Sequence, residues 1–472
     1  MKIFKQKVML LMLLAFTFVF SNISFAAEKP EVKAEAAILI EPSTGKVLFE
    51  KNADKKMYPA SMTKLLTAII ALDNFSPDDV ILVGNEINEV SLDSSKAGHV
   101  RGESITVRNL IRGLIIPSGN DTAEVIANAV VKKVQNDDTL SPKECDVLFS
   151  EMMNKKAEEL GCTNTNFSNP HGYHDENHYT TAHDMSKIAS KALEYDVLMQ
   201  ICSEKSYSGN SMEDKDSAGV RTKEYNWSSH NLLITNGEYA YPYATGLKTG
   251  FTDEAGDCIA ASAEKDGIQL VAIIFNSEDP GRWEDAAALF NYGFENYNFF
   301  TIAQNGSVVG QVPLHNHNKA DGDNLDLIIK EDISLYLDKE VLGAIETDIE
   351  ITNEEYIYQE DTKDSETPTT FINAPITQDT EIGKVSYKYN GEVLAETPVY
   401  AGRTVEEATF FEKIGYTFKD IASKLFTKDG LIKFGIGAAV IIVIALIIKF
   451  VSSRRRRSRN VYKFKNNKRR RY

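Results

Sequence analysis

A 21-residue apolar segment near the C-terminus, LIKFGIGAAVIIVIALIIKFV (431–451), most constrains the architecture that this chain can adopt. A helix of this length is about 31 Å long, which is enough to cross the hydrocarbon core of a bilayer. Residues 452–472 contain eleven Lys or Arg and no acidic residue. Excess positive charge marks the cytoplasmic side of a membrane segment. We therefore expect a single transmembrane helix at 431–451 and a basic cytoplasmic tail at 452–472.

The N-terminus carries an apolar stretch of a different kind. Residues 1–7 contain three lysines, residues 8–20 are predominantly apolar, and Ser24 and Ala26 follow at the spacing that signal peptidase recognises. The stretch is too short to span a bilayer, so residues 1–26 are expected to be a removable signal peptide. The two ends together predict a single-pass protein of the cell membrane whose folded part lies on the extracellular face.

The charge of the chain limits its partners. The formal net charge is −16, and removing the three basic residues at the N-terminus and the eleven in the tail leaves −30 for residues 8–453. We do not expect such an acidic exported region to bind nucleic acid. The basic tail could bind nucleic acid in principle, but a flank that stops transfer across the membrane explains it more simply.

Four cysteines lie in the exported part: Cys145, Cys162, Cys202 and Cys258. They are too few for a fold that is built on disulfides. Their pairing stays open at the level of sequence. Cys258 lies in an apolar, strand-like run and fits a buried thiol.

Between the ends, residues 34–298 mix helix and strand patterns and are expected to form one domain. The patterns predict a hairpin around a Pro-Ser-Thr-Gly turn, two apolar helices separated by a break, a buried strand and a further helix. In the same order, these segments are AAILIEPSTGKVLFE (36–50), VRNLIRGLIIPSGNDTAEVIANAVV (107–131), GIQLVAIIFNS (267–277) and RWEDAAALFNYGFENY (282–297).

The composition changes near residue 299. Short β-type runs alternate with Asn, Gly and Pro turns, which predicts a small β-rich domain over 299–403. Residues 406–426 follow as an expected amphipathic helix that lies on the lipid surface. Its apolar positions, at helical spacing, are Phe410, Ile414, Phe418, Ile421 and Leu425.

The segment PASMTKLL places Ser61 at a helix start and Lys64 one turn further on. Residues three apart share a helix face, so the amine of Lys64 should lie beneath the hydroxyl of Ser61. Ser-x-x-Lys alone is a weak signal, and Ser61 could simply cap the helix. The motif also occurs at Ser43/Lys46, across a hairpin turn, and at Ser262/Lys265, where a strand runs into a turn. Neither of these fits a helical pair.

Two further motifs strengthen the case for a catalytic serine. Ser118-Gly119-Asn120 lies in the break between the two apolar helices, and Lys248-Thr249-Gly250 lies at the start of a strand. A second Ser-Gly-Asn, at 208–210, sits in a polar loop without an apolar frame and is set aside.

In this order the three motifs resemble those of the active-site serine penicillin-recognising enzymes. The likeness is greatest to the low-molecular-mass penicillin-binding proteins of peptidase family S11 type, which are D-alanyl-D-alanine carboxypeptidases. It covers about 34–425 and includes the segments 36–72, 167–185, 246–263 and 374–401. The resemblance implies an α/β (α+β) domain of the serine β-lactamase/transpeptidase type, with a mainly antiparallel sheet flanked by helices, followed by a small β-rich domain.

Two features depart from many members of this family. The expected anchor is a full membrane span with a basic tail, where many relatives rely on an amphipathic helix alone. Phe251 follows the Lys-Thr-Gly motif where some members have His, which leaves fine substrate preference open.

The resemblance assigns the acyl-transfer roles. Ser61 would be the nucleophile and Lys64 its base, because burial and the like charge of Lys248 both favour a neutral amine. Ser118 would relay a proton to the departing D-alanine, and whether Lys64 or Ser118 donates that proton stays open. The backbone N–H groups of Ser61 and Phe251 would form the oxyanion hole.

Substrate-binding roles follow in the same way. Asn120 would bond the substrate backbone and orient Lys64, while Lys248 and Thr249 would hold the terminal carboxylate. Gly250 would let the substrate lie against the strand without an intervening side chain. Arg282, in PGRW, resembles a family arginine near the carboxylate, although a surface arginine at a helix start explains it equally well.

The implied function is removal of the last D-alanine from peptidoglycan stem peptides that end in D-Ala-D-Ala, with β-lactam antibiotics as covalent inhibitors, membrane lipid as a further partner and no cofactor. Two alternatives share the motifs. A β-lactamase needs a positioned water to clear the acyl-enzyme, and no loop with a suitable glutamate is evident. A membrane-anchored β-lactam sensor would acylate with little turnover.

The segment PHGYHDENHYTTAH suggests a metal site because it contains His171, His174, His178 and His183. The spacing is not the His-Glu-x-x-His of helical zinc hydrolases, and no cysteine joins it. A loop that bonds its own backbone and borders a cleft is the simpler interpretation.

Overall fold

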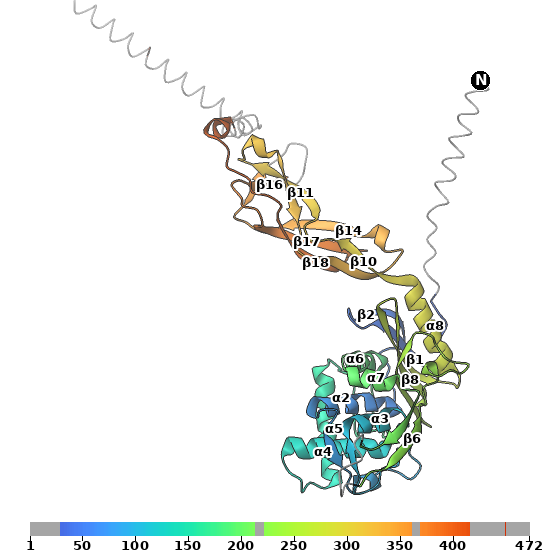
Figure 1. The fold of residues 1–472 in the computed structure, drawn as a ribbon. Helices are drawn as coiled ribbons and strands as arrows, with labels where there is room; N and C mark the ends of the chain where they lie inside the picture. Colours follow the sequence, from blue (N-terminus) through green and yellow to red (C-terminus); the bar gives the residue numbers. More distant parts are fainter. Residues whose placement is uncertain (1–28, 213–220, 361–368, 416–448, 450–472) are drawn as a thin grey trace, which may run out of the picture. The chain divides into compact units, whose positions relative to one another are not determined.

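The computed structural model describes residues 29–212, 221–360, 369–415 and 449. The chain forms two compact units, one up to Phe300 that also includes Tyr336–Gly343, and the other formed by Thr301–Leu335 and the residues from Ala344 onward (Figure 1). Within the described ranges no helix has both the length and the apolar character needed to cross a membrane. The expected signal peptide, transmembrane helix and basic tail lie outside these ranges, except for Lys449.

The first unit is built on a five-stranded sheet in which every neighbouring pair is antiparallel. The predicted hairpin and the predicted buried strand are confirmed as its strands β1, β2 and β9. In spatial order the strands are β2 (Lys46–Lys51), β1 (Ala36–Glu41), β9 (Ile268–Ser277), β8 (Gly256–Lys265) and β7 (Ala244–Thr252). The mainly antiparallel sheet that the family resemblance implied is therefore present.

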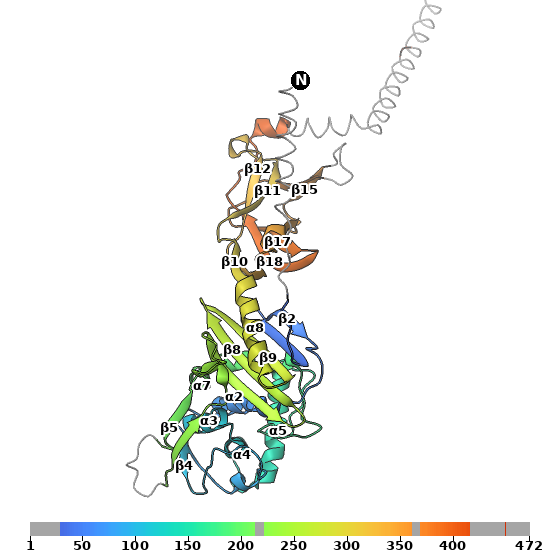
Figure 2. The same cartoon turned by 90° about the vertical axis from the view of Figure 1, so that its right-hand side faces the viewer.

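Alternate residues of the sheet pack against helices on its two faces. Ile38 and Ile40 of β1 join the cluster that contains α2 (Lys64–Asn74), whereas Leu39 joins the cluster that contains α8 (Gly281–Asn296). Side chains alternate between the faces of a strand, so a strand buried on both faces has apolar residues at every position. Figure 2 shows α8 over the face of β8 and β9 that is opposite to α2.

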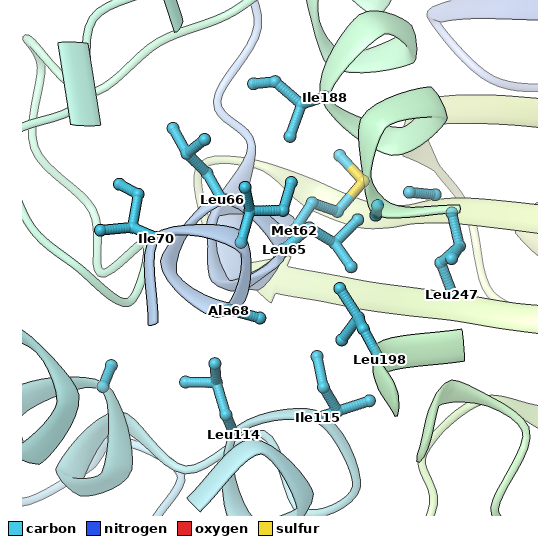
Figure 3. Close-up of a cluster of buried hydrophobic side chains, with 14 of the residues drawn as sticks. Met62, Leu65, Leu66, Ala68, Ile70, Leu114, Ile115, Ile188, Leu198 and Leu247 are labelled. Carbon is cyan, nitrogen blue, oxygen red and sulfur yellow. The ribbon is translucent and has the colours of Figure 1, made fainter. Parts of the chain in front are cut away.

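The central helix α2 directly follows the turn that carries the candidate nucleophile, Ser61. All of its residues from Lys64 to Ala71 are buried, as expected for a helix that is apolar on every side. The helices around it are α3 (Val107–Ile115), α4 (Asn120–Gln135), α5 (Pro142–Glu159), α6 (Ala182–Ala192) and α7 (Asp196–Cys202). Figure 3 shows the labelled side chains of this region, Met62, Leu65, Leu66, Ala68 and Ile70, among Leu114, Ile115, Ile188, Leu198 and Leu247.

Capping fixes where the surrounding helices begin. The predicted helix, break and helix are α3 and α4, and Thr106 caps α3 by accepting a hydrogen bond from the backbone N–H of Asn109. Ser141 and Glu144 form a capping box at the start of α5. Two small two-stranded sheets also belong to the unit: β3 (Val80–Leu82) with β4 (Ser104–Thr106), and β5 (Ser206–Asn210) with β6 (Glu224–Ser228). A third pairs β10 (Tyr297–Ala303) with β13 (Ile333–Asp338). All four cysteines are free and buried.

The second unit confirms the expected β-rich domain. Its seven-stranded sheet has only one parallel pair, β11 with β16, and its core consists of aliphatic residues such as Leu325, Ile382 and Val399. In spatial order the strands are β14 (Glu346–Ile351), β17 (Glu381–Tyr389), β18 (Glu392–Ala401), β12 (Asn324–Ile328), β11 (Val308–His315), β16 (Thr369–Asn373) and β15 (Ile357–Glu360). Of the expected amphipathic helix, residues 410–415 are helical, with Phe410 and Phe411 exposed.

Candidate active site

Ser61 and Lys64 lie where a short 3-10 turn runs into the central helix. The turn η1 (Ala60–Thr63) carries Ser61, and Lys64 is the first residue of α2. Nζ of Lys64 lies 2.7 Å from Oγ of Ser61. The spacing in the sequence therefore does place the amine beneath the hydroxyl.

Lys64 is enclosed by acceptors that come from two distant segments. Nζ donates to Oδ1 of Asn120 at 2.7 Å and to the backbone carbonyl of His171 at 2.8 Å. The Lys64 side chain is inaccessible to solvent. Three oxygen atoms, including Oγ of Ser61, thus fix the direction of the nitrogen.

Burial and like charge both disfavour a protonated Lys64. The pKa of Lys64 lies well below its ordinary value, first because the amine is desolvated and then because Lys248 carries a like charge nearby; Asp121 acts in the opposite direction. A lysine that gives up its proton readily can accept one from a neighbouring hydroxyl. The site therefore contains a nucleophile and a base in direct contact.

The Ser118-Gly119-Asn120 motif lies in the break between α3 and α4. Asn120 begins α4, and its amide oxygen faces Lys64. Ser118 is buried and has a φ of 60°, which is uncommon for a residue other than glycine. A side chain at Gly119 would come within 2.8 Å of Cβ of Ala97, so the tight turn before α4 requires glycine. The tight turn thus fixes the backbone of Ser118 two residues before Asn120, whose amide oxygen accepts from Lys64.

Lys248 and Thr249 lie on β7 and are buried. Nζ of Lys248 donates to the carbonyl of Thr249 at 3.0 Å. Desolvation, with a smaller contribution from the charge of Arg282, lowers the pKa of Lys248 to about 7. Lys248 can therefore take up or release a proton near neutral pH, and its charge acts on Lys64.

The structure gives a further reason for glycine at position 250, and the expected approach of substrate stays a prediction. A Cβ atom at this position would lie 2.9 Å from the carbonyl oxygen of Pro59 and 3.3 Å from the backbone nitrogen of Ser61. The absent side chain therefore faces the turn that carries the nucleophile. Glycine is required here because β7 and η1 approach each other closely.

Arg282 lies at the start of α8 but is not a surface arginine, because its side chain is only 15% exposed. Its Nη1 lies 2.5 Å from Oδ1 of Asp257 and 3.4 Å from the carbonyl oxygen of Gly250. The guanidinium is therefore next to the Lys-Thr-Gly strand, and its contact with a substrate carboxylate stays a prediction.

These segments border a groove of about 470 Å³. Ser61, Asn120 and Phe251 line it, and Phe251 is more than half exposed. Its other walls come from residues 93–95, 172–174 and 252–254. Ser61 and Asn120 thus line the groove, and the Lys-Thr-Gly motif approaches Ser61 through Gly250. Ser118, Lys248 and Thr249 are buried and do not line it.

Several residues that build the site carried no recognisable signal in the sequence. The carboxylate of Asp121 accepts hydrogen bonds from the backbone N–H groups of Ala97, Gly98 and His99, which fixes the loop that leads into the groove wall. His171 contributes its backbone carbonyl as an acceptor for Lys64. Both depend on approaches between segments that are remote in sequence.

Two family models match the chain. One, described as D-alanyl-D-alanine carboxypeptidase, matches residues 23–279. The other, described as penicillin-binding protein 5, C-terminal domain, matches residues 297–407.

Curated relatives cover most of the chain. D-alanyl-D-alanine carboxypeptidase DacF of Bacillus subtilis is 30% identical over 393 residues, which is 82% of this chain and 90% of that protein. D-alanyl-D-alanine carboxypeptidase DacD of Escherichia coli is 27% identical over 412 residues, or 85% of this chain and 94% of that protein.

Solved structures agree on the fold. Penicillin-binding protein 5 from Haemophilus influenzae superposes with a TM-score of 0.58 at 24% identity, over 81% of this chain and all of that chain. A mutant of the Streptomyces K15 DD-transpeptidase has a TM-score of 0.51 at 28% identity, over 57% of this chain and all of that chain. With its three motifs gathered at one site, this chain belongs to the D-alanyl-D-alanine carboxypeptidase family of penicillin-binding serine peptidases.

Proposed function

We propose that this protein is a serine-type D-Ala-D-Ala carboxypeptidase that removes the terminal D-alanine from peptidoglycan stem pentapeptides, and that penicillin acylates the same serine. The observation that carries this function is the 2.7 Å contact between the buried amine of Lys64 and the hydroxyl of Ser61. Membership in the family and the names of the relatives support the substrate.

Acylation begins at Ser61. Oγ attacks the carbonyl carbon of the penultimate D-alanine while the neutral amine of Lys64 takes the hydroxyl proton. The backbone N–H groups of Ser61 and Phe251 hold the resulting oxyanion. The C–N bond then breaks, and the departing amine receives a proton from Lys64 directly or through Ser118.

Deacylation uses the same base. Water loses a proton to Lys64 and attacks the ester carbonyl, which releases the shortened peptide and restores the hydroxyl of Ser61. In penicillin the cleaved amide bond lies in a ring, so the leaving group stays attached and hinders the attack of water. A long-lived penicilloyl ester on Ser61 is the result.

The terminal carboxylate of the substrate is bound by Lys248, Thr249 and Arg282. Lys248 and Arg282 supply positive charge beside β7, and a charge-assisted contact to a carboxylate is strong when the partners are buried. Asn120 bonds the substrate backbone while its amide oxygen holds Lys64.

Exported, membrane-anchored placement is part of this proposal. The signal-peptide pattern of residues 1–26, the apolar segment 431–451 and the basic residues 452–472 support it. Protease added to intact cells should digest the folded part and spare an epitope fused after Tyr472. Digestion of that epitope in intact cells would contradict the orientation.

One assay separates the competing activities. The full-length protein is incubated with a diacylated Lys-D-Ala-D-Ala peptide and, separately, with labelled penicillin. Repeated release of free D-alanine supports the carboxypeptidase, retained label without release identifies a sensor, and rapid penicillin hydrolysis identifies a β-lactamase. Ser61→Ala should lose both label and turnover, and label that persists in this variant would overturn the role of Ser61.

A further inference from the structure

Helix α4 presents two polar side chains, one turn apart, toward the Lys64 region. Asn120, at its first position, accepts directly from Nζ of Lys64 at 2.7 Å. Glu124, four residues on, is buried, and its Oε1 lies 3.2 Å from Nε2 of His171. The backbone carbonyl of His171 also accepts from Nζ of Lys64, at 2.8 Å.

The contacts of the His171 ring fix where its proton lies. The backbone N–H of Tyr173 donates to Nδ1 at 3.0 Å, so Nδ1 is an acceptor. The proton of the neutral ring is therefore on Nε2 and points to Glu124. Burial and the charge of Lys64 lower the pKa of His171 to about 3, which agrees with a neutral ring.

Glu124 is itself held by a second carboxyl group. Asp146 on α5 and Glu124 share a hydrogen bond, and we call them the carboxyl pair. Desolvation raises the pKa of Glu124 to about 7 and that of Asp146 to about 8. Glu124 is buried and Asp146 is half-buried. Neighbouring carboxyl groups of this kind retain a proton between them, so Asp146 can donate to Glu124 while Glu124 accepts from His171.

The turn around His171 has a further anchor. Oδ1 of Asn169 accepts from the backbone N–H of Gly172 at 2.7 Å, and Nδ2 of Asn169 donates to the carbonyl of Tyr173 at 2.9 Å. Asn169 therefore closes the turn locally, whereas Glu124 ties its ring to α4. Asn120 and Glu124 belong to the same helix. The amide oxygen of Asn120 and the carbonyl oxygen of His171, which both accept from Lys64, are therefore positioned by one rigid element.

We infer that Glu124 is a positioning residue for acylation: acting through the ring of His171, its carboxyl group holds the His171 carbonyl where it aims the amine of Lys64 at Ser61. The inference rests on the proposed roles of Ser61 and Lys64. Other charged groups act on the pair, namely Glu86 and Glu89 on Glu124, and Glu89 on Asp146.

The test measures acylation of the full-length protein by labelled penicillin, resolved into a non-covalent binding constant and an acylation rate constant. Glu124→Leu removes the acceptor for His171 and should lower the acylation rate constant about tenfold or more, with binding within twofold. Glu124→Gln keeps an acceptor oxygen and should stay within about threefold of the wild type. Glu151→Gln, an exposed carboxylate on α5, is the matched control and should match the wild type.

A double-mutant cycle separates positioning from general damage. If Glu124 acts only through Lys64, Glu124→Leu should change nothing further in a Lys64→Ala background. His171→Phe keeps an aromatic ring but cannot donate to Glu124, so it should reproduce the loss even if Glu124→Leu fails to fold. Thermal stability is expected to fall in both variants, because each leaves a buried partner without its hydrogen bond. The double-mutant cycle therefore compares acylation rate constants of folded protein and not stabilities.

The outcomes distinguish this inference from the proposed function. The positioning role would be overturned if Glu124→Leu and His171→Phe acylated at the wild-type rate. It would also be overturned if the losses in rate from Glu124→Leu and Lys64→Ala were additive. Neither outcome would prevent release of D-alanine by the wild type. A selective loss in the acylation step without any D-alanine release would support positioning and refute carboxypeptidase turnover. Absence of acylation in the wild type would overturn both.

Discussion

Gly172 lies directly against the backbone carbonyl of Ala60. A side chain at Gly172 would collide with that carbonyl and come within 2.8 Å of Oγ1 of Thr63. The φ angle of Gly172 is 84°, a value that side-chain-bearing residues rarely adopt. The turn that supplies a carbonyl to Lys64 is therefore packed against the turn that carries the nucleophile.

Gly172→Ala should destabilise the protein by about 2–4 kcal/mol, because it combines a steric clash with an unfavourable backbone conformation. It should also slow penicillin acylation, since the displaced turn carries the His171 carbonyl. The measurement is thermal denaturation together with the acylation rate. Gly161→Ala is the control: φ is 77° there, but nothing lies within 4 Å, so only about 1 kcal/mol should be lost. Equal effects of the two variants would show that the Ala60 contact is unimportant.

Lys248→Gln should move the pH dependence of acylation to higher pH. Acylation needs a neutral Lys64, so its rate rises with pH through the pKa of Lys64. The charge of Lys248 lowers that pKa, and its removal lets Lys64 keep its proton to higher pH. The pH–rate profile of penicillin acylation reports the shift. An unmoved ascending limb would mean that the two amines are not coupled.

Asp121→Asn should move the ascending limb of the pH–rate profile of acylation to lower pH, opposite to the effect of Lys248→Gln. The negative charge of Asp121 raises the pKa of Lys64, so the neutral amide should leave Lys64 unprotonated at lower pH. The amide also presents an N–H group to backbone donors of residues 97–99, and each buried donor left unpaired costs about 1–3 kcal/mol. Asp138→Asn, which removes an exposed charge, should leave the profile in place. A shift to higher pH in Asp121→Asn would refute the electrostatic assignment.

Local geometry explains which parts of the site the sequence could predict. Ser61 and Lys64 are three residues apart at a helix start, so their contact follows from helix geometry alone. The helix break that carries Ser118 and the strand that carries Lys248 follow from short apolar patterns. The strands β1, β2 and β9 were predictable for the same reason.

The remaining contacts depend on segments that meet only after folding. Lys64 and His171 are 107 residues apart, and nothing in either segment marks the His171 carbonyl as an acceptor. Asp121 looks like any acidic residue in the first turn of a helix, where a negative charge interacts favourably with the helix dipole. Its carboxylate also anchors the loop at 97–99, which the sequence does not indicate. Gly250 was predicted to make room for substrate, and nothing in the sequence indicates that it also makes room for the backbone of Pro59.

Arg282→Gln should weaken recognition of the substrate carboxylate more than it slows the chemical step. The guanidinium lies beside the carbonyl of Gly250, next to the buried amine of Lys248. Loss of one charge-assisted contact predicts a KM for the diacylated D-Ala-D-Ala peptide that is raised about tenfold, which corresponds to about 1.4 kcal/mol, with a smaller change in kcat.

The same substitution has a predictable effect on pH dependence. Arg282 helps to lower the pKa of Lys248 to about 7, so kcat/KM should fall above that pH as Lys248 loses the proton with which it holds the carboxylate. Without Arg282 the pKa of Lys248 rises, and this descending limb should move to higher pH. Asp257→Asn is the control, because it breaks the ion pair of Arg282 and leaves the guanidinium in place. If both variants lose stability equally and neither changes KM, Arg282 acts only through Asp257 and does not contact the substrate.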